Sequence, residues 1–250
     1  MCKFFSGVSD GKGKFMYFDS KLRKECLSGK LNYNPDSHTS IADYFGYKGK
    51  REDVLNKYEY NPLTKVFEID QLNSKDDSER IKDTCLNLDF KKIVPELIIK
   101  DIVNPFELGT IKVYKKDIAL LKQWDSVRDS IWDSVWGSVG GSVGGSVWGS
   151  VWDSVRDSVG DSVRDSVRDS VGGSVRDSVW DSVGAYISSF FNLKKWKYIE
   201  HKEGVNPFQS CIDLWERGLV PSYDGKLRRL HGKGGKVLWE GKVLRVVNNG

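Results

Sequence analysis

A branched aliphatic residue recurs at every fourth position through the middle of the chain, from Val127 to Val183. Each one closes a unit with the pattern x-(Asp/Gly)-Ser-(Val/Ile), and fifteen such units follow one another from Trp124 to Val183. The serine never varies, and the last position is Val in every unit except the one that ends at Ile131. This tetrapeptide array is the dominant hydrophobic pattern of the sequence, so its conformation decides the fold.

The array favours a short β-solenoid, in which each unit forms one side of a coil and points its valine inward. The Asp or Gly at the second position would form the corner, because both residues tolerate tight turns. Successive coils would then stack and bury a continuous column of valines.

A long α-helical segment and a disordered segment are the two alternatives. In an α-helix, residues four apart advance by about 400°, so the valine column drifts about 40° around the helix with each unit. Ser, Val, Asp and Gly are also poor helix formers. Apolar residues beside the array nevertheless keep helical spacing, namely Ile118, Leu121 and Trp124 before it and Val183, Ile187 and Phe191 after it. The six Trp and fifteen aliphatic side chains of the array argue against disorder.

The first position of the unit predicts a recognition surface. It carries Trp six times, Arg five times and Gly four times. A buried position would not accept all three, so we expect this position to face solvent while the valines face inward. Exposed Trp and Arg are common among the residues that dominate protein interfaces. The predicted partner-binding residues are Trp132, Trp136, Trp148, Trp152, Arg156, Arg164 and Arg168.

Drift at the DNA level is the competing explanation for this mixture. Trp, Arg and Gly can share codons that end in GG, and Asp and Gly codons differ by one middle base. A twelve-nucleotide repeat that grew by slippage would produce the same variation without selection for binding. Both explanations stay open.

The flanking segments have an α+β pattern. In residues 1–123, hairpins are predicted from the alternation in 3–8 with 14–18 and in 58–60 with 66–69. Helices are predicted to begin near Asp19, Ser40 and Ser74. The interrupted apolar run 93–99 predicts an edge strand or a loop, because it contains Pro95.

Residues 184–250 repeat this style on a smaller scale. They predict a strand over 196–199, a helix that opens at Asn206 and ends at Gly218, and strands over 227–231 and 237–239. A segment this short is small for an independent core, so we expect it to pack on the rest of the chain or to cap the array. The predicted organisation is an α+β fold with three parts, 1–123, 124–183 and 184–250.

Composition excludes several classes of protein. The 250 residues carry a net charge of +4, which is divided unevenly: the array has ten Asp and five Arg, whereas residues 184–250 are basic. No apolar run is long enough for a membrane span. Asp10 comes too early for a secretory signal peptide. Four cysteines without CxxC spacing indicate neither a zinc site nor a disulfide framework. These features predict a cytoplasmic protein without a membrane partner.

Several segments resemble a group of bacteriophage and gut-metagenome proteins. The similar runs are NPDSHTSIADYFG, NKYEYNPLTKVFEIDQLN, NPFQSCIDLWERGLVPSYDGK and LRRLHGKGGKVLWE. Proteins of this group also carry a tetrapeptide array of variable length between similar ends, so the likeness covers nearly the whole chain. The resemblance implies a phage setting, with the protein in the host cytoplasm, and brings no activity, cofactor or catalytic residue.

No catalytic signature is present, and no cofactor or metal is predicted. His38 and His201 lie in polar runs that are typical of exposed loops. Cys211 shares an apolar stripe with Phe208, Ile212 and Trp215, which predicts a core thiol. The run from His231 to Lys236 lacks the Ser or Thr and the following helix of a phosphate-binding loop, so it predicts a hairpin loop.

The sequence therefore predicts a non-enzymatic interaction or scaffold protein that presents the Trp/Arg positions to a protein partner. Nucleic-acid binding by the basic C-terminal segment is the alternative. Its residues would be Lys194, Lys195, Trp196, Arg228, Arg229 and Lys233, in which cations alternate with an aromatic ring as they do in single-strand binders.

Overall fold

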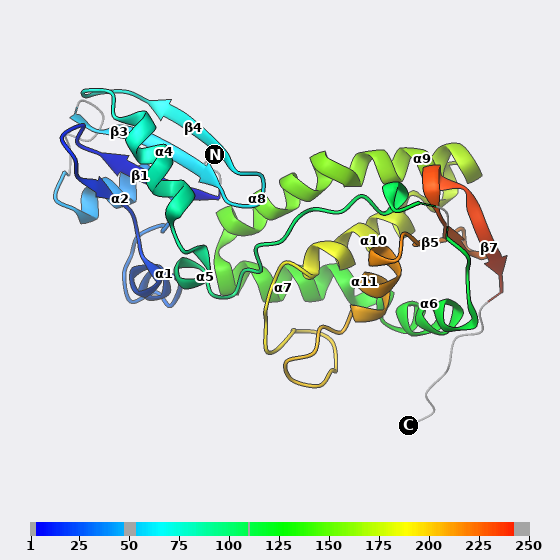
Figure 1. The fold of residues 1–250 in the computed structure, drawn as a ribbon. Coiled ribbons are helices and arrows are strands. Elements are labelled where there is room, and N and C mark those ends of the chain that lie inside the picture. Colours follow the sequence, from blue (N-terminus) through cyan, green and yellow to red (C-terminus); the bar gives the residue numbers. More distant parts are fainter. Residues whose placement is uncertain (1–3, 48–53, 110, 243–250) are drawn as a thin grey trace. The chain divides into compact units, whose positions relative to one another are not determined.

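The computed structural model describes residues 4–47, 54–109 and 111–242, and the chain packs as two compact units. The first unit comprises residues 1–100 and 139–152, and the second comprises residues 101–138 and 153–250. Each unit contains one small antiparallel sheet and several helices, so the α+β class fits (Figure 1). The array is divided between the two units, and Lys3 of the first predicted strand lies outside the described residues.

The sheet of the first unit has the strand order β2-β1-β3-β4. Its strands are β1 (Phe5–Ser9), β2 (Phe15–Met16), β3 (Asn56–Asn61) and β4 (Val66–Gln71). Val8 pairs with Met16 in the first hairpin, and Asn61 pairs with Val66 in the second. Both predicted hairpins are therefore confirmed.

The helices of the first unit are α1 (Ser20–Leu27), α2 (His38–Tyr44), α4 (Ser78–Asn87) and α5 (Phe90–Ile93). Asp19 caps α1 as predicted, because its carboxylate accepts a hydrogen bond from the Leu22 amide at 2.9 Å. Helix α2 begins earlier than predicted, because Ser37 rather than Ser40 is its cap. His38 is consequently buried, with Nε2 3.0 Å from the Tyr58 carbonyl, so the prediction of an exposed loop histidine is wrong.

The sheet of the second unit has the order β5-β6-β7. Its strands are β5 (Val220–Tyr223), β6 (Arg228–His231) and β7 (Val237–Gly241), and the helices beside it include α6 (Lys115–Val127) and α11 (Gln209–Glu216). The predicted strand over 196–199 is wrong, because the backbone turns there and Tyr198 adopts a positive φ of 60°. The unit also contains the short 3-10 turns η1 (Pro105–Glu107) and η5 (Lys233–Gly235).

The array is helical except at Gly144 and Gly172, so the predicted solenoid is wrong. Its segments are η2 (Arg128–Ser130), α7 (Ile131–Val143), α8 (Gly145–Val155), η3 (Arg156–Gly160, a π-helix), α9 (Asp161–Val171), η4 (Gly173–Val175) and α10 (Arg176–Ser188). The helical spacing at both flanks thus continues into the array. Several of its serines, such as Ser162 and Ser182, donate to a carbonyl three or four residues earlier, which satisfies the hydroxyl inside a helix.

The valine column is buried, as predicted, although the array is helical. Of its fifteen residues only Val127 and Val171 are partly exposed, and the others are at most 3% exposed. The column stays inside because the helix is interrupted before the drift of about 40° per unit carries it to the surface. Gly144 and Gly172 stop α7 and α9 with φ of 87° and 86°, and the wider turn of π-helix η3 rotates the column back.

Two array serines attach β5 to α10 within the second unit. The Ser178 hydroxyl accepts from the Tyr223 amide at 2.8 Å, and the Ser182 hydroxyl donates to the Pro221 carbonyl at 3.1 Å. Four residues of helix rise about 6 Å, and two residues of strand rise nearly the same distance. The distance from Ser178 to Ser182 along the helix therefore matches the distance from Tyr223 to Pro221 along the strand. In this way α10 covers the outer side of the edge strand β5.

Candidate functional site

Two highly exposed aromatic side chains are found at α7, one on the helix and one on a loop that packs against it. Tyr198 is 73% exposed and Trp136 is 61% exposed, the two highest values among the large apolar side chains of the described residues. The Tyr198 ring lies against Gly137, the residue after Trp136, since a Cβ on Gly137 would come within 2.5 Å of the ring. We call Trp136 and Tyr198 the aromatic platform.

The loop that carries Tyr198 is held at several points. The Lys197 amide donates to the Ser138 hydroxyl on α7 at 2.7 Å, and the Trp196 amide donates to Nε2 of His201 at 2.8 Å. Trp196 itself is 2% exposed and packs edge-on against Phe208 with ring centroids 5.8 Å apart. A buried anchor beside the platform therefore fixes the backbone of the loop.

The other predicted tryptophans are less available than Trp136. Trp148 is 4% exposed and packs against Trp152, with ring centroids 6.0 Å apart. Trp132 is half-buried, since it covers Gly184 and donates from Nε1 to Asp181 at 2.8 Å. The first position of the unit is thus not uniformly exposed.

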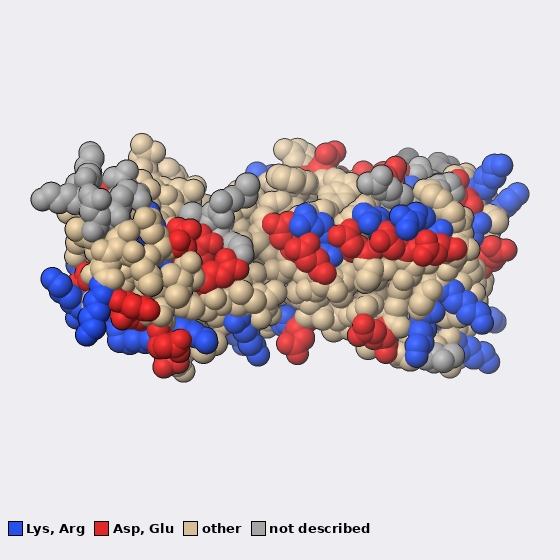
Figure 2. All heavy atoms as spheres, turned by 90° about the horizontal axis from the view of Figure 1, so that it is seen from above, with Lys and Arg blue, Asp and Glu red and all other residues tan. Residues whose placement is uncertain are grey.

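The predicted arginines form ion pairs with the aspartates around them. Arg156, Arg164 and Arg168 each contact the carboxylates three residues before and one residue after, at 2.9–3.4 Å. Figure 2 shows this Arg–Asp band as blue and red side chains that run side by side over one face. Because each guanidinium already has two carboxylate neighbours, the band offers a partner little uncompensated charge.

The residues of the nucleic-acid alternative lie in different environments. Lys194, Lys195 and Lys233 are exposed. Trp196 and Arg228 are buried, and Arg229 pairs with Asp224 at 2.7 Å and with Glu240 at 3.3 Å. Trp196 therefore cannot stack on a base, and the exposed ring of this segment is Tyr198.

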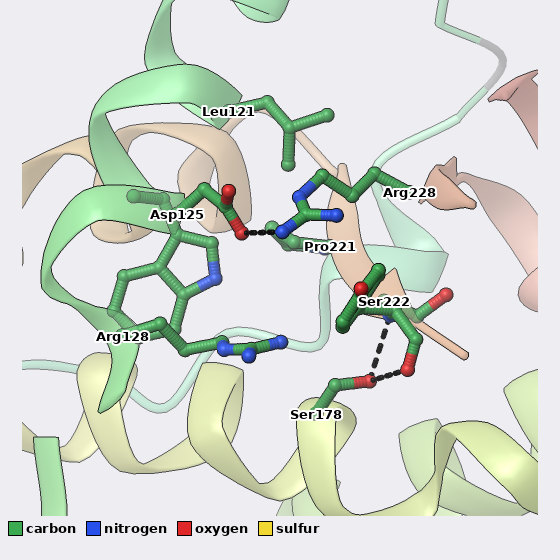
Figure 3. A pocket seen from close by; sticks show the side chains of 9 residues that line it. Leu121, Asp125, Arg128, Ser178, Pro221, Ser222 and Arg228 are labelled. Carbon is green, nitrogen blue, oxygen red and sulfur yellow. Dashed lines mark hydrogen bonds and ion pairs between the residues drawn. The ribbon is translucent and has the colours of Figure 1, made fainter. Parts of the chain in front are cut away.

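A polar cavity lies between α6 and the sheet of the second unit (Figure 3). Arg228 reaches across it to Asp125 at 2.6 Å, and both side chains are at least nine-tenths buried. The Tyr223 ring lies near two guanidinium groups, 3.9 Å from that of Arg228 and 5.1 Å from that of Arg128. This cluster joins the first array unit to the C-terminal sheet.

The cavity has the size of one water molecule. Its volume is about 10 Å³, and the Asp125 Oδ2, Arg128 Nε and Arg228 Nε atoms have no hydrogen-bond partner among the described residues. Buried waters commonly make about three hydrogen bonds to such atoms. The arrangement suits a structural water between α6 and β6 and leaves no room for a larger ligand.

Asp181 makes folding depend on pH. Burial raises the pKa of its carboxyl to about 6, although Trp132 and Arg128 oppose the rise, and Asp129 and Asp177 add to it. Because the folded protein holds this proton more tightly than the unfolded chain, the group stabilises the fold below pH 3.8 and loses that contribution as the pH rises through about 6.

We therefore expect Asp181→Asn to gain stability over the wild type as the pH rises. The amide keeps an acceptor for Trp132 but carries no charge, so the gain should reach roughly 3 kcal/mol between about pH 4 and pH 7. Urea unfolding of both proteins across this range measures it. Asp133→Asn, which changes an exposed aspartate in an identical tetrapeptide, is the control. A stability difference between Asp181→Asn and the wild type that does not change with pH would contradict the raised pKa of Asp181.

Three groups with catalytic potential are buried, namely the Cys211 thiol, the Ser222 hydroxyl and the His231 ring. Burial raises the pKa of the Cys211 thiol, which lies in the core as predicted. Burial lowers the pKa of His231 to about 4, so its neutral ring donates to the Gly235 carbonyl and accepts from the Ser222 hydroxyl at 2.7 Å. Ser222 and His231 are at most 3% exposed, so a substrate cannot reach this pair.

Within the described residues, no group of three His, Cys, Asp or Glu side chains is arranged to hold a metal ion. In the same part of the chain, no helix combines the length and the apolar surface needed to cross a bilayer. Comparisons with protein-family models, with curated proteins and with solved structures gave no match.

The sequence predicts an exposed Trp136 but does not predict Tyr198 beside Gly137. It predicts a strand at Tyr198, whereas the contact with Gly137 joins residues 61 positions apart. The glycine at the second position of that unit, where most units have Asp, was the available signal.

Proposed function

We propose that this protein is a non-enzymatic interaction protein whose recognition surface is the aromatic platform of Trp136 and Tyr198. The observation that carries the proposal is that the Tyr198 ring lies against Gly137, the residue next to Trp136, and that Tyr198 and Trp136 are the two most exposed large apolar side chains of the described residues. Large exposed rings on a fixed backbone are the residues that dominate binding energy at interfaces. The array then serves as the scaffold that holds Trp136 in position.

The Arg–Asp band is the weaker candidate for recognition, because its charges are already compensated. A phage setting and a place in the host cytoplasm remain predictions that rest on the resemblance of the sequence. A protein is the partner class that the array first suggested, and the test below detects protein and nucleic acid separately.

Affinity capture from a bacterial lysate, with and without nuclease treatment, tests this function. We expect the double variant Trp136→Ala/Tyr198→Gly to lose the captured partner, because it removes both rings. The matched control is the triple variant Arg156→Ala/Arg164→Ala/Arg168→Ala, which changes array residues outside the platform and should keep the partner. Equal capture by the wild type and the double variant would contradict the proposal.

A further inference from the structure

The aromatic platform lies beside a run of exposed cations. Lys194, Lys195 and Lys197 precede Tyr198 within four residues, and all three are exposed. Residues 192–205 contain four lysines and two glutamates, so this loop carries a net charge of +2. The surface therefore combines flat apolar rings with uncompensated positive charge.

This combination complements a strand of unpaired bases. Bases present ring faces that stack on aromatic side chains, and the phosphates between them are negative. We propose that the platform binds single-stranded nucleic acid, with bases stacked on Tyr198 and Trp136 and phosphates held by Lys194, Lys195 and Lys197. The inference rests on the proposed function and names the partner class of the same surface.

The backbone at Tyr198 holds the ring ready for stacking. Its φ of 60° is a left-handed conformation that non-glycine residues rarely adopt. The surrounding hydrogen bonds maintain it, including those from Lys197 to Ser138 and from Gly204 to the Lys194 carbonyl at 2.8 Å. A ring fixed in this way loses little conformational entropy when a base stacks on it.

Gly137 makes the platform possible. The second position is Asp in ten of the fifteen units, and any side chain at residue 137 would come within 2.5 Å of the Tyr198 ring. An aspartate there would also add negative charge next to the phosphates. The glycine in this unit thus removes both a steric and an electrostatic obstacle.

Fluorescence anisotropy of the full chain with a labelled oligothymidine tests the proposal. We expect Tyr198→Gly and Trp136→Ala each to weaken binding roughly 5- to 100-fold, the effect of losing one stacked base. Tyr198→Gly removes the ring at a backbone position that suits glycine, so the fold is kept, and Tyr198→Phe should restore binding. Gly137→Ala should weaken binding while favouring the helix.

Salt dependence tests the lysines. Three phosphate contacts predict that log K falls with log salt with a slope of about −2, since each contact on a single strand contributes about −0.7. The variant Lys194→Ala/Lys195→Ala should flatten this slope, whereas Lys233→Ala, an exposed lysine on another loop, should leave it unchanged.

Three results would overturn the inference: no binding at roughly 50 mM salt, equal binding by Tyr198→Gly and the wild type, or equal affinity for a duplex of the same sequence. If nuclease-treated lysate still yields a protein whose capture needs Trp136, and the oligothymidine does not bind, the inference fails while the proposed function stands.

Discussion

Replacing Asp125 with alanine is expected to lower the free energy of unfolding by about 3–5 kcal/mol. Arg228 would keep its charge in a buried position, 7% exposed, after losing the carboxylate 2.6 Å away. A lone buried charge is strongly destabilising because nothing compensates its lost hydration. Urea unfolding followed by circular dichroism measures the loss.

Asp133→Ala is the matched control for this prediction. Both aspartates belong to the same tetrapeptide, Trp-Asp-Ser-Val, but Asp133 is exposed, so its loss should cost no more than about 0.5 kcal/mol. Replacing both partners, as in Asp125→Leu/Arg228→Met, should recover most of the stability because no charge remains unpaired. Equal effects of Asp125→Ala and Asp133→Ala would contradict the buried pair.

Replacing Val163 with aspartate is expected to cost about 4 kcal/mol or more. Val163 is fully buried in the valine column on α9, so the variant forces a carboxylate into an apolar interior without a partner. Loss of the cooperative unfolding transition at ordinary temperature is the result we expect from a thermal melt.

Ser162→Asp, one residue earlier on the same helix, provides the comparison. Ser162 is exposed, and its loss removes only a hydrogen bond to the Val159 carbonyl, so the cost should stay below about 1 kcal/mol. If Ser162→Asp proved as damaging as Val163→Asp, the column would not face inward.

The sequence predicted the inward direction of the valines but not the conformation that produces it. Inward valines at every fourth position suit a solenoid and an interrupted helix equally well, and helix propensities alone favoured the solenoid. The deciding features are the stops at Gly144 and Gly172 and the π-helix at Arg156–Gly160, which correct the drift of the column. Gly140 and Gly160 occupy the same position of the unit without a positive φ, so local sequence does not mark the stops.

Identical tetrapeptides show most clearly where prediction from the sequence ends. Four units have the identical sequence Trp-Asp-Ser-Val, and their aspartates are Asp125, Asp133, Asp153 and Asp181. The first pairs with Arg228, the second is exposed, the third pairs with Arg156 on the surface, and the fourth is partly buried and accepts a hydrogen bond from Trp132. Because their local sequences are the same, only contacts with distant segments distinguish them.

The candidate site was also only partly predictable from the sequence. The exposed ring of Trp136 was predictable from a position that tolerates Trp, Arg and Gly. Tyr198 was not, because its place depends on the Trp196 anchor and on the hydrogen bond between the Lys197 amide and Ser138. The hairpins and capped helices of the flanks were largely predictable, since turn and cap residues act within a few positions of one another.

The Cα chemical shifts of the array valines test the central claim most directly. In the full-length protein with ¹³C-labelled valine, 14 of the 26 valines belong to the array, so a helical array predicts that about half of the Cα resonances lie at the downfield values of helical residues. Upfield shifts typical of strands, or a single narrow random-coil group, would contradict it.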